Sequence, residues 1–299
     1  NKMDIADIDW INAIKLAEQN KISYKIFKGT NLDTNLKFSV GKLVRTEELR
    51  IRNLDLSFAR ACRLFNDLDL TYIVVKSFKQ YQFCSKNDYD IIMPDEPHRK
   101  RALRLLKDLG YAFYRGRTLE EPYKCSCVKG DSQIDIYPRA AWNRMKVIDT
   151  DHLFRRRKSC IFEGLEVYKP SNEDELLILA SHSFAHRTVT LSEMFEVITI
   201  VKGRVDWKYV FEQAKRYGIV HQLYCSLHLA NVIHSYCFGD HLIPLSVFSE
   251  LYRHPVVRIS RTSLVRQNIS LPFKIPLLII FVSVIYRSFL DIQCKDLSL

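Results

Sequence analysis

The chain has 299 residues, of which 47% are hydrophobic and 26% are charged, the proportions of an ordinary globular protein. Eight cysteines, none in a C-x-x-C pair, argue against a disulfide framework and a zinc site and favour buried free thiols. The net charge of +11 favours an anionic partner such as a nucleotide, RNA or an acidic membrane face, although a basic surface without a specific partner is an equal alternative.

The N-terminal part of the chain reads as helical. Its first residues are polar and acidic and do not resemble a secretory signal, so we expect a cytoplasmic protein. Within a helical segment over residues 1–69, apolar residues recur at helical spacing from Asp4 to Asn20 and from Thr46 to Leu68, whereas residues 21–44 read as mixed structure punctuated by glycines such as Gly41. The arginines of the second helix are most simply a solvated face, with contact to RNA or phosphate as the alternative.

Residues 70–168 are expected to form an α/β core. Thr71–Val75 is β-branched and aromatic, which predicts a buried strand, followed by a sharp turn and a short helix. The next strand is predicted over Asp88–Met93, and Asp88 and Asp90 then project to the same side because side chains alternate along a strand. Neighbouring carboxylates repel unless a cation lies between them, and Mg²⁺ prefers such oxygen ligands. An acidic pair that caps or salt-bridges locally is the alternative.

Further core elements follow in order. A helix is predicted over Pro97–Leu109, then a strand over Tyr111–Tyr114 and a hairpin of Tyr123–Val128 and Ser132–Tyr137. A lone acid, Asp135, lies in the apolar second strand of this hairpin, which makes it a third candidate ligand or, alternatively, a residue on a wet face. We therefore expect an α+β (α/β) fold with a small mixed sheet flanked by helices.

Residues 169–299 are expected to form a helical C-terminal domain. Ser171 and Asp174 have the spacing of a capping box at the start of a helix over 172–186. His182 and His186 lie one turn apart on that helix; we expect packing or contact with the core, with metal ligation as the alternative. Three more helices are predicted, over Leu191–Val201, from Asp206 to Tyr217 and over Val220–Cys237.

Two stretches leave their role open. The basic residues that run from Arg139 through Arg144 and Lys146 to Arg155–Lys158 suit a triphosphate or a nucleic acid backbone, or are solvated loop charges. Residues 276–286 are almost continuously apolar but are too few to cross a bilayer, which needs about 20. We expect a buried helix there. The alternative is an anionic membrane surface bound through residues 253–290, which implies a peripheral position at the inner membrane face.

Five motifs occur in a fixed order along the chain. They are Arg52-Asn53, Val74-Val75-Lys76-Ser77, Asp88-Tyr89-Asp90, Ile134-Asp135-Ile136 and His182-x3-His186. This ordered set resembles the uncharacterised nucleotidyltransferase family, a branch of the superfamily related to DNA polymerase β. The resemblance extends from about Trp10 to about Gly239.

The resemblance implies an enzyme that moves an NMP group from an NTP such as ATP to a hydroxyl group and releases pyrophosphate. It implies that the Asp135 strand lies beside the Asp88 strand, and that Asp88, Asp90 and Asp135 are catalytic and bind Mg²⁺, as two ions, with Asp135 also the general base. The acceptor is left open among a small molecule, a glycan- or lipid-linked molecule, a protein and RNA. The nucleotide contacts that the resemblance implies are Lys76, Ser77, Lys79 and Lys86.

Two positions differ from the family's pattern. Ser77 stands where the family has Gly, and Lys86 is the cation nearest to the D-x-D pair, where the family has Arg. The alternative function is therefore a weakly active or inactive scaffold of this type that binds RNA or an anionic membrane surface.

Overall fold

The computed structural model describes residues 9–27, 34–76, 85–115, 123–142, 145–254, 257 and 272–275. The helices are α1 (Trp10–Gln19), the short 3-10 helix η2 (Tyr24–Phe27), α2 (Thr34–Asp67), α3 (Glu96–Asp108), α4 (Thr150–Arg155), α5 (Asn172–Ala185), α6 (Leu191–Lys202), α7 (Trp207–Arg216), α8 (Val220–Phe238) and α9 (Leu245–Tyr252). The strands are β1 (Ile73–Val75), β2 (Tyr89–Ile92), β3 (Ala112–Arg115), β4 (Cys125–Lys129), β5 (Ser132–Tyr137), β6 (Ala141–Trp142), β7 (Met145–Lys146), β8 (Lys158–Phe162), β9 (Leu165–Lys169), β10 (Thr188–Val189) and β11 (Phe273–Lys274).

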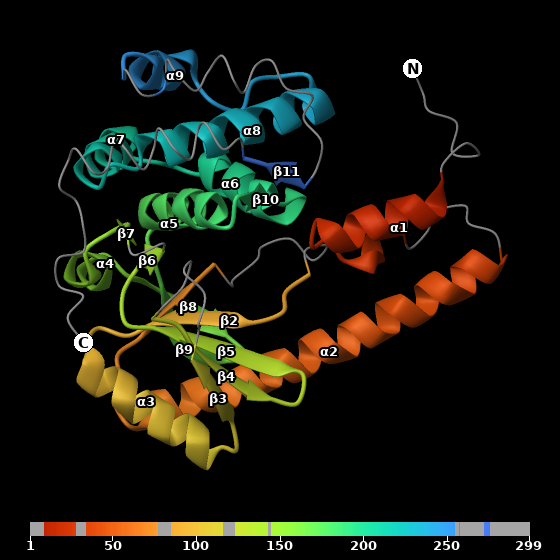
Figure 1. Cartoon of the computed structure of the whole chain (residues 1–299), viewed down its shortest axis with the longest axis vertical. Helices are drawn as coiled ribbons and strands as arrows, with labels where there is room; N and C mark the ends of the chain where they lie inside the picture. Colours follow the sequence, from red (N-terminus) through yellow and green to blue (C-terminus); the bar gives the residue numbers. More distant parts are fainter. Residues whose placement is uncertain are drawn as a thin grey trace.

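A five-stranded mixed sheet forms the centre of the molecule, in the order β1-β2-β5-β4-β3. The pair β2 and β5 is parallel, and the other neighbours are antiparallel. Helices α2 and α3 lie on one side of the sheet, and the helices from α5 onward are stacked on the other side (Figure 1). This confirms the expected α+β class, and it confirms that the Asp135 strand lies beside the Asp90 strand.

Strand alternation divides the sheet between two hydrophobic cores. On β1, Val74 packs into the core shared with α2 and α3, whereas Ile73 and Val75 pack into the core shared with the C-terminal helices. The α2 side contains stacked aromatic rings, because Phe58 and Tyr89 lie 3.8 Å apart between ring centroids. Both faces are therefore buried, which explains why the central strands are apolar along nearly their whole length.

The predicted mixed structure over residues 21–44 was wrong from residue 34 onward. Helix α2 begins at Thr34 and continues through Gly41 without a break. Val40 and Val44 lie one turn apart and are buried against α1 and η2, so tertiary packing outweighs the low helix propensity of glycine. The division of the chain at residues 69 and 168 stays a prediction.

Most other predicted elements are confirmed, but the hairpins β6–β7 and β8–β9 and the short helices α4 and α9 were not predicted. Helices α3 and α5–α8 and the hairpin β4–β5 lie where periodicity and caps placed them. The basic Arg155–Lys158 stretch leads into the unpredicted hairpin β8–β9, whose turn residues Glu163 and Gly164 have φ of 48° and 75°. Successive positive φ values suit a tight hairpin turn.

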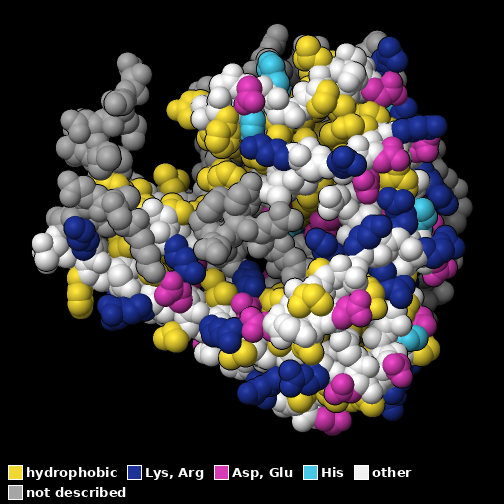
Figure 2. Space-filling view, turned by 180° about the vertical axis from the view of Figure 1, so that it is seen from behind, with side chains coloured by type: hydrophobic (Ala, Val, Ile, Leu, Met, Phe, Trp, Pro, Cys, Tyr) yellow, Lys and Arg dark blue, Asp and Glu magenta, His cyan; other side chains and the backbone are white. Residues whose placement is uncertain are grey.

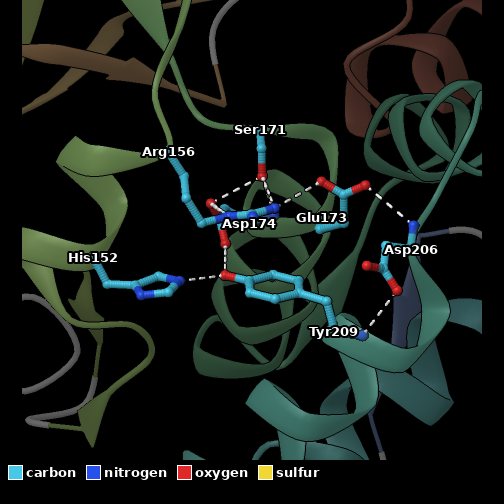
Figure 3. Close-up of polar contacts among 7 residues, drawn as sticks. All are labelled: His152, Arg156, Ser171, Glu173, Asp174, Asp206 and Tyr209. Atoms are coloured by element: carbon cyan, nitrogen blue, oxygen red, sulfur yellow. Dashed lines mark hydrogen bonds and ion pairs between the residues drawn. The ribbon is translucent and has the colours of Figure 1, made fainter.

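A buried polar network joins α4, α5 and α7 (Figure 3). Asp174, which is fully buried, accepts hydrogen bonds from Tyr209 Oη, from Ser171 Oγ at 2.9 Å and from Arg156 Nε at 3.2 Å. The Arg156 guanidinium also stacks on the Tyr209 ring, 3.9 Å from its centroid. The predicted Ser171 cap is thus confirmed, since Ser171 Oγ accepts from Asp174 N, and the network fixes the start of α5.

In the part of the chain that the structure describes, no helix combines the length and the apolar character needed to cross a membrane. The apolar stretch 276–286, with its alternatives of a buried helix and a membrane contact, lies outside the described residues.

Candidate active site

Two of the three predicted carboxylates are opposite each other in neighbouring strands. Asp90 of β2 pairs in parallel register with Asp135 of β5, and paired strands lie about 4.8 Å apart. Alternation places both side chains on the face that also carries Ile92 and Tyr137, which is the face covered by the C-terminal helices. Asp90 is 7% exposed and Asp135 is fully buried. Asp88 precedes β2 and is half-buried.

The three aspartates line one cavity of about 350 Å³ between the sheet and α5–α6. Its two walls differ in character. The sheet wall carries the aspartates together with Lys76, Lys124 and Tyr137, and the helical wall carries histidine, threonine and glutamate. The helical lining consists of Leu179, His182, His186, Thr188, Thr190, Glu193 and Glu196.

Lysines neutralise the two buried aspartates. Lys76 Nζ lies 3.3 Å from Asp90 Oδ2, and Lys124 Nζ lies 3.1 Å from Asp135 Oδ2. Burial raises the pKa of the Asp135 carboxyl, an effect that the Lys124 ammonium opposes and the Asp88 charge increases. Gln133 Nε2 donates to Asp135 Oδ1 at 2.9 Å and fixes that side chain. No local pattern of residues pairs Lys124 with Asp135, so this partner was not predicted.

Among the described residues, no three His, Cys, Asp or Glu side chains stand together in a geometry that could hold a metal ion. The aspartates share a cavity, but lysines take the positions of positive charge beside two of them. The assignment of Asp88, Asp90 and Asp135 as Mg²⁺ ligands therefore stays a prediction.

The backbone of Lys76 has a conformation that is unusual for residues other than glycine. Its φ is 57°, in the left-handed region, directly at the end of β1. The Lys76 N–H donates to Glu175 Oε1 of α5 at 2.7 Å, so a helix that lies 99 residues further along the chain fixes this turn. Glu175 was not among the predicted site residues, because nothing in the local sequence pairs it with Lys76.

Of the other predicted nucleotide contacts, the structure describes one, Lys86. Lys86 borders the cavity, but its ammonium lies 2.5 Å from Asp55 of α2 and donates to Tyr89 Oη at 2.6 Å. Ser77 and Lys79 lie outside the described residues, as does the short helix predicted after the turn. The contact of all three side chains with nucleotide stays a prediction.

The two histidines of α5 face the same cavity as the aspartates. Their Nε2 atoms lie 3.0 Å apart, and His182 Nδ1 lies 3.6 Å from Glu193 Oε1 of α6. Burial, followed by the nearby Lys76 ammonium, lowers the pKa of His182 to about 3. His182 is therefore uncharged at neutral pH. The sequence analysis expected packing or contact with the core, with metal ligation as the alternative. Contact with the core fits, since the histidines line the same cavity as residues of the sheet.

A second, basic pocket of about 470 Å³ lies at the start of α5. Arg155, Lys158 and Arg204 line it, and no described residue forms an ion pair with any of the three. Figure 2 shows Lys and Arg side chains gathered at mid-height along one edge, the edge where Figure 1 has α4. Arg144, from the same basic stretch of sequence, lies outside the described residues.

Comparisons with known proteins give a family and a distant structural likeness. The family described as uncharacterised nucleotidyltransferase matches residues 6–234. A solved structure, an antigenic nucleotidyltransferase-like protein from Paracoccidioides brasiliensis, is 14% identical, with a TM-score of 0.38, and covers 66% of this chain and 96% of its own. A comparison with curated proteins found no significant match.

Proposed function

The chain belongs to the uncharacterised nucleotidyltransferase family, and on that premise we propose that it transfers an NMP group from an NTP to an acceptor hydroxyl. One observation carries the proposal: the register of β2 and β5 sets Asp90 opposite Asp135 in a cavity whose lining also includes Asp88 and four lysines. Acidic and cationic groups together suit a metal-bound triphosphate, which needs both metal ligands and direct phosphate contacts.

Asp88, Asp90 and Asp135 would hold Mg²⁺, as two ions. The donor set fits, because hard divalent ions take carboxylate oxygens, and the buried Asp135 Oδ2 already has a cation beside it, the Lys124 ammonium at 3.1 Å. When bound, the ions supply charge neutralisation to the triphosphate and lower the pKa of the attacking hydroxyl. Lys76 and Lys124, which neutralise two of the aspartates, would move to the phosphate oxygens as the ions take their place.

In the transfer step, the acceptor oxygen bonds to the α-phosphorus as the α–β phosphoanhydride bond breaks. Pyrophosphate leaves with the bonding electron pair, and the hydroxyl proton passes to Asp135. A carboxyl whose pKa is raised by burial is a better proton acceptor than one at its ordinary value. Glu175 assists indirectly, because it holds the backbone of Lys76 in the left-handed turn that directs its ammonium into the cavity.

The test is Mg²⁺-dependent release of pyrophosphate from each of the four NTPs. The double variant Asp88→Ala/Asp90→Ala is expected to lower the rate by at least about 100-fold, the scale of losing a preorganised charge. Asp131→Asn, in the exposed hairpin turn after β4, is the matched control and should keep the wild-type rate. Equal release of pyrophosphate by the double variant and the wild type would refute the proposal.

The second candidate, a scaffold that binds RNA or an anionic membrane surface, is favoured by the basic pocket beside α5. Arg155, Lys158 and Arg204, which form no ion pair with any described residue, suit phosphate groups. This candidate is tested by the fluorescence anisotropy of a labelled 20-nucleotide RNA, measured with and without 0.3 M salt. At 0.3 M the Debye length is about 6 Å, which screens contacts with phosphate. Salt-sensitive binding that is lost in Arg155→Gln/Lys158→Gln but kept in Asp88→Ala/Asp90→Ala would support the scaffold over the enzyme.

A further inference from the structure

The arginines of α2 were expected to be a solvated face, with contact to RNA or phosphate as the alternative. Helix α2 is 34 residues long and extends beyond the sheet at its N-terminal end (Figure 1). Exposed residues recur in steps of three or four from Phe38 to Arg63, so they lie on one face of the helix. The opposite face is buried against α1, η2 and the sheet. We call this row of three apolar and five basic residues the α2 stripe; it is about 38 Å long.

The α2 stripe is cationic. Its basic residues are Lys42, Arg45, Arg52, Arg60 and Arg63. Arg52 forms an ion pair with Glu163 at 2.9 Å, whereas no residue in the described part of the chain forms an ion pair with the other four. The carboxylates between Phe38 and Arg63 lie on other faces of α2, where they contact residues before α2 or before β2; they are Glu47, Glu48 and Asp55. The stripe thus presents four cations to solvent without a carboxylate among them.

The apolar residues of the stripe are exposed too. Phe38 is 71% exposed, Leu49 66% and Leu56 39%. A single exposed leucine needs no explanation, because much of any protein surface is apolar. Three large apolar side chains in one row with cations form a pattern, however, and exposed apolar surface with a polar border marks an interaction site. Within the described residues, more than half of the exposed large apolar side chains belong to α1, η2 and α2.

The composition of the stripe favours a lipid surface over nucleic acid. Its cations suit the phosphates of either partner. Nucleic acid gains from aromatic side chains, on which its bases stack, but not from leucine. At an anionic membrane, by contrast, leucine and phenylalanine both enter the boundary between headgroups and acyl chains, while Lys and Arg stay at the lipid phosphates. Two of the three apolar residues are leucines, so a membrane uses both the apolar and the basic members of the stripe.

We propose that the α2 stripe binds the surface of an anionic membrane, with α2 parallel to that surface and its three apolar side chains directed into the lipid. This goes beyond the proposed function and does not depend on it. Helix α2 lies on the opposite side of the sheet from α5 and α6, which line the cavity (Figure 1). A membrane bound at the stripe therefore leaves the cavity accessible.

Flotation of the full chain with lipid vesicles tests the proposal. The wild type should float with phosphatidylcholine vesicles that contain about 30% phosphatidylglycerol, and not with phosphatidylcholine alone. Leu49→Gln/Leu56→Gln should weaken this binding by at least about tenfold, because apolar surface no longer enters the lipid. Arg45→Gln/Arg63→Gln should weaken it about 25-fold, at about fivefold for each cation. All four positions are exposed, so the variants should fold, which circular dichroism checks.

The matched control is Leu245→Gln on α9, a leucine that is 72% exposed outside the stripe, and it should bind as the wild type does. The assignment is overturned if the wild type binds no anionic vesicles, if both α2 variants bind as well as the wild type, or if Leu245→Gln weakens binding equally. Binding of a labelled 20-nucleotide RNA in place of vesicles, lost in the arginine variant and kept in the leucine variant, would overturn it in favour of nucleic acid.

Failure of this proposal is distinguishable from failure of the proposed function. Without vesicles, both α2 variants should release pyrophosphate from NTP at the wild-type rate, because the stripe does not line the cavity. A wild type that floats with anionic vesicles but releases no pyrophosphate would refute the proposed function and support the membrane surface.

Discussion

Replacing Glu175 by glutamine should change how the stability of the protein depends on pH. Burial raises the pKa of the Glu175 carboxyl from 4.5 to about 7, although the Lys76 N–H and ammonium oppose this. A carboxyl with a raised pKa binds its proton more tightly in the folded state. Its contribution to stability is therefore complete below pH 4.5 and is lost as the pH rises through 7.

The size of the change in the free energy of unfolding follows from the pKa shift of Glu175. The limit is about 3.4 kcal/mol across that interval, at about 1.4 kcal/mol for each pH unit. Glu175 retains some contact with solvent, which screens its charge, so we expect about half of this limit. Glutamine keeps an oxygen that accepts the Lys76 N–H but cannot ionise. Glu175→Gln should therefore be about 1.7 kcal/mol more stable than the wild type at pH 8, with no advantage at pH 4.

Urea unfolding of the wild type and the variant at pH 4, 6 and 8 measures this difference. Glu166→Gln, at an exposed position of β9, is the matched control and should follow the wild-type curve. The reasoning is refuted if Glu175→Gln also follows the wild-type curve, or if it is the less stable protein at pH 8. In that case Glu175 would be ionised without penalty, and the turn at Lys76 would be held in some other way.

Three further predictions concern the fold and the site. Gly41→Ala should raise the free energy of unfolding by about 0.5–1 kcal/mol, since a Cβ there meets nothing within 4 Å; a loss would mean that α2 does not run through residue 41. Tyr209→Phe should cost about 1–2 kcal/mol and Asp174→Ala about 3–5 kcal/mol, because the latter leaves Arg156 without its buried partner; equal costs would argue against the network. Mg²⁺ with a non-hydrolysable NTP should raise the Tm of the wild type but not of Asp90→Asn/Asp135→Asn, and an equal rise in both would contradict binding at these carboxylates.

Local signals in the sequence were sufficient for most of the fold. Ser171 and Asp206 cap helices as their positions before apolar runs predict, and alternation along Asp88–Met93 assigns Asp90 to the same face as Ile92. Where prediction failed, a distant contact outweighed a local preference. Gly41 lies inside a helix because Val40 and Val44 pack on α1.

The candidate site was predictable only in its acidic part. The three aspartates lie in recognisable strand motifs, whereas the groups that pair with them or complete the cavity are distant in sequence. Glu175 lies 99 residues from Lys76, and Glu193 reaches His182 only because α6 folds back beside α5. Such contacts depend on the packing of helices, which carries no signature in a local stretch of sequence.

The most direct test of the whole account is a crystal structure of the full chain with Mg²⁺ and a non-hydrolysable NTP. We predict that the triphosphate lies in the cavity against Lys76 and Lys124, with ions bound by Asp88, Asp90 and Asp135 and with the helical wall open to an acceptor. A nucleotide found in the basic pocket instead, or aspartates that keep their lysine partners and bind no ion, would contradict it.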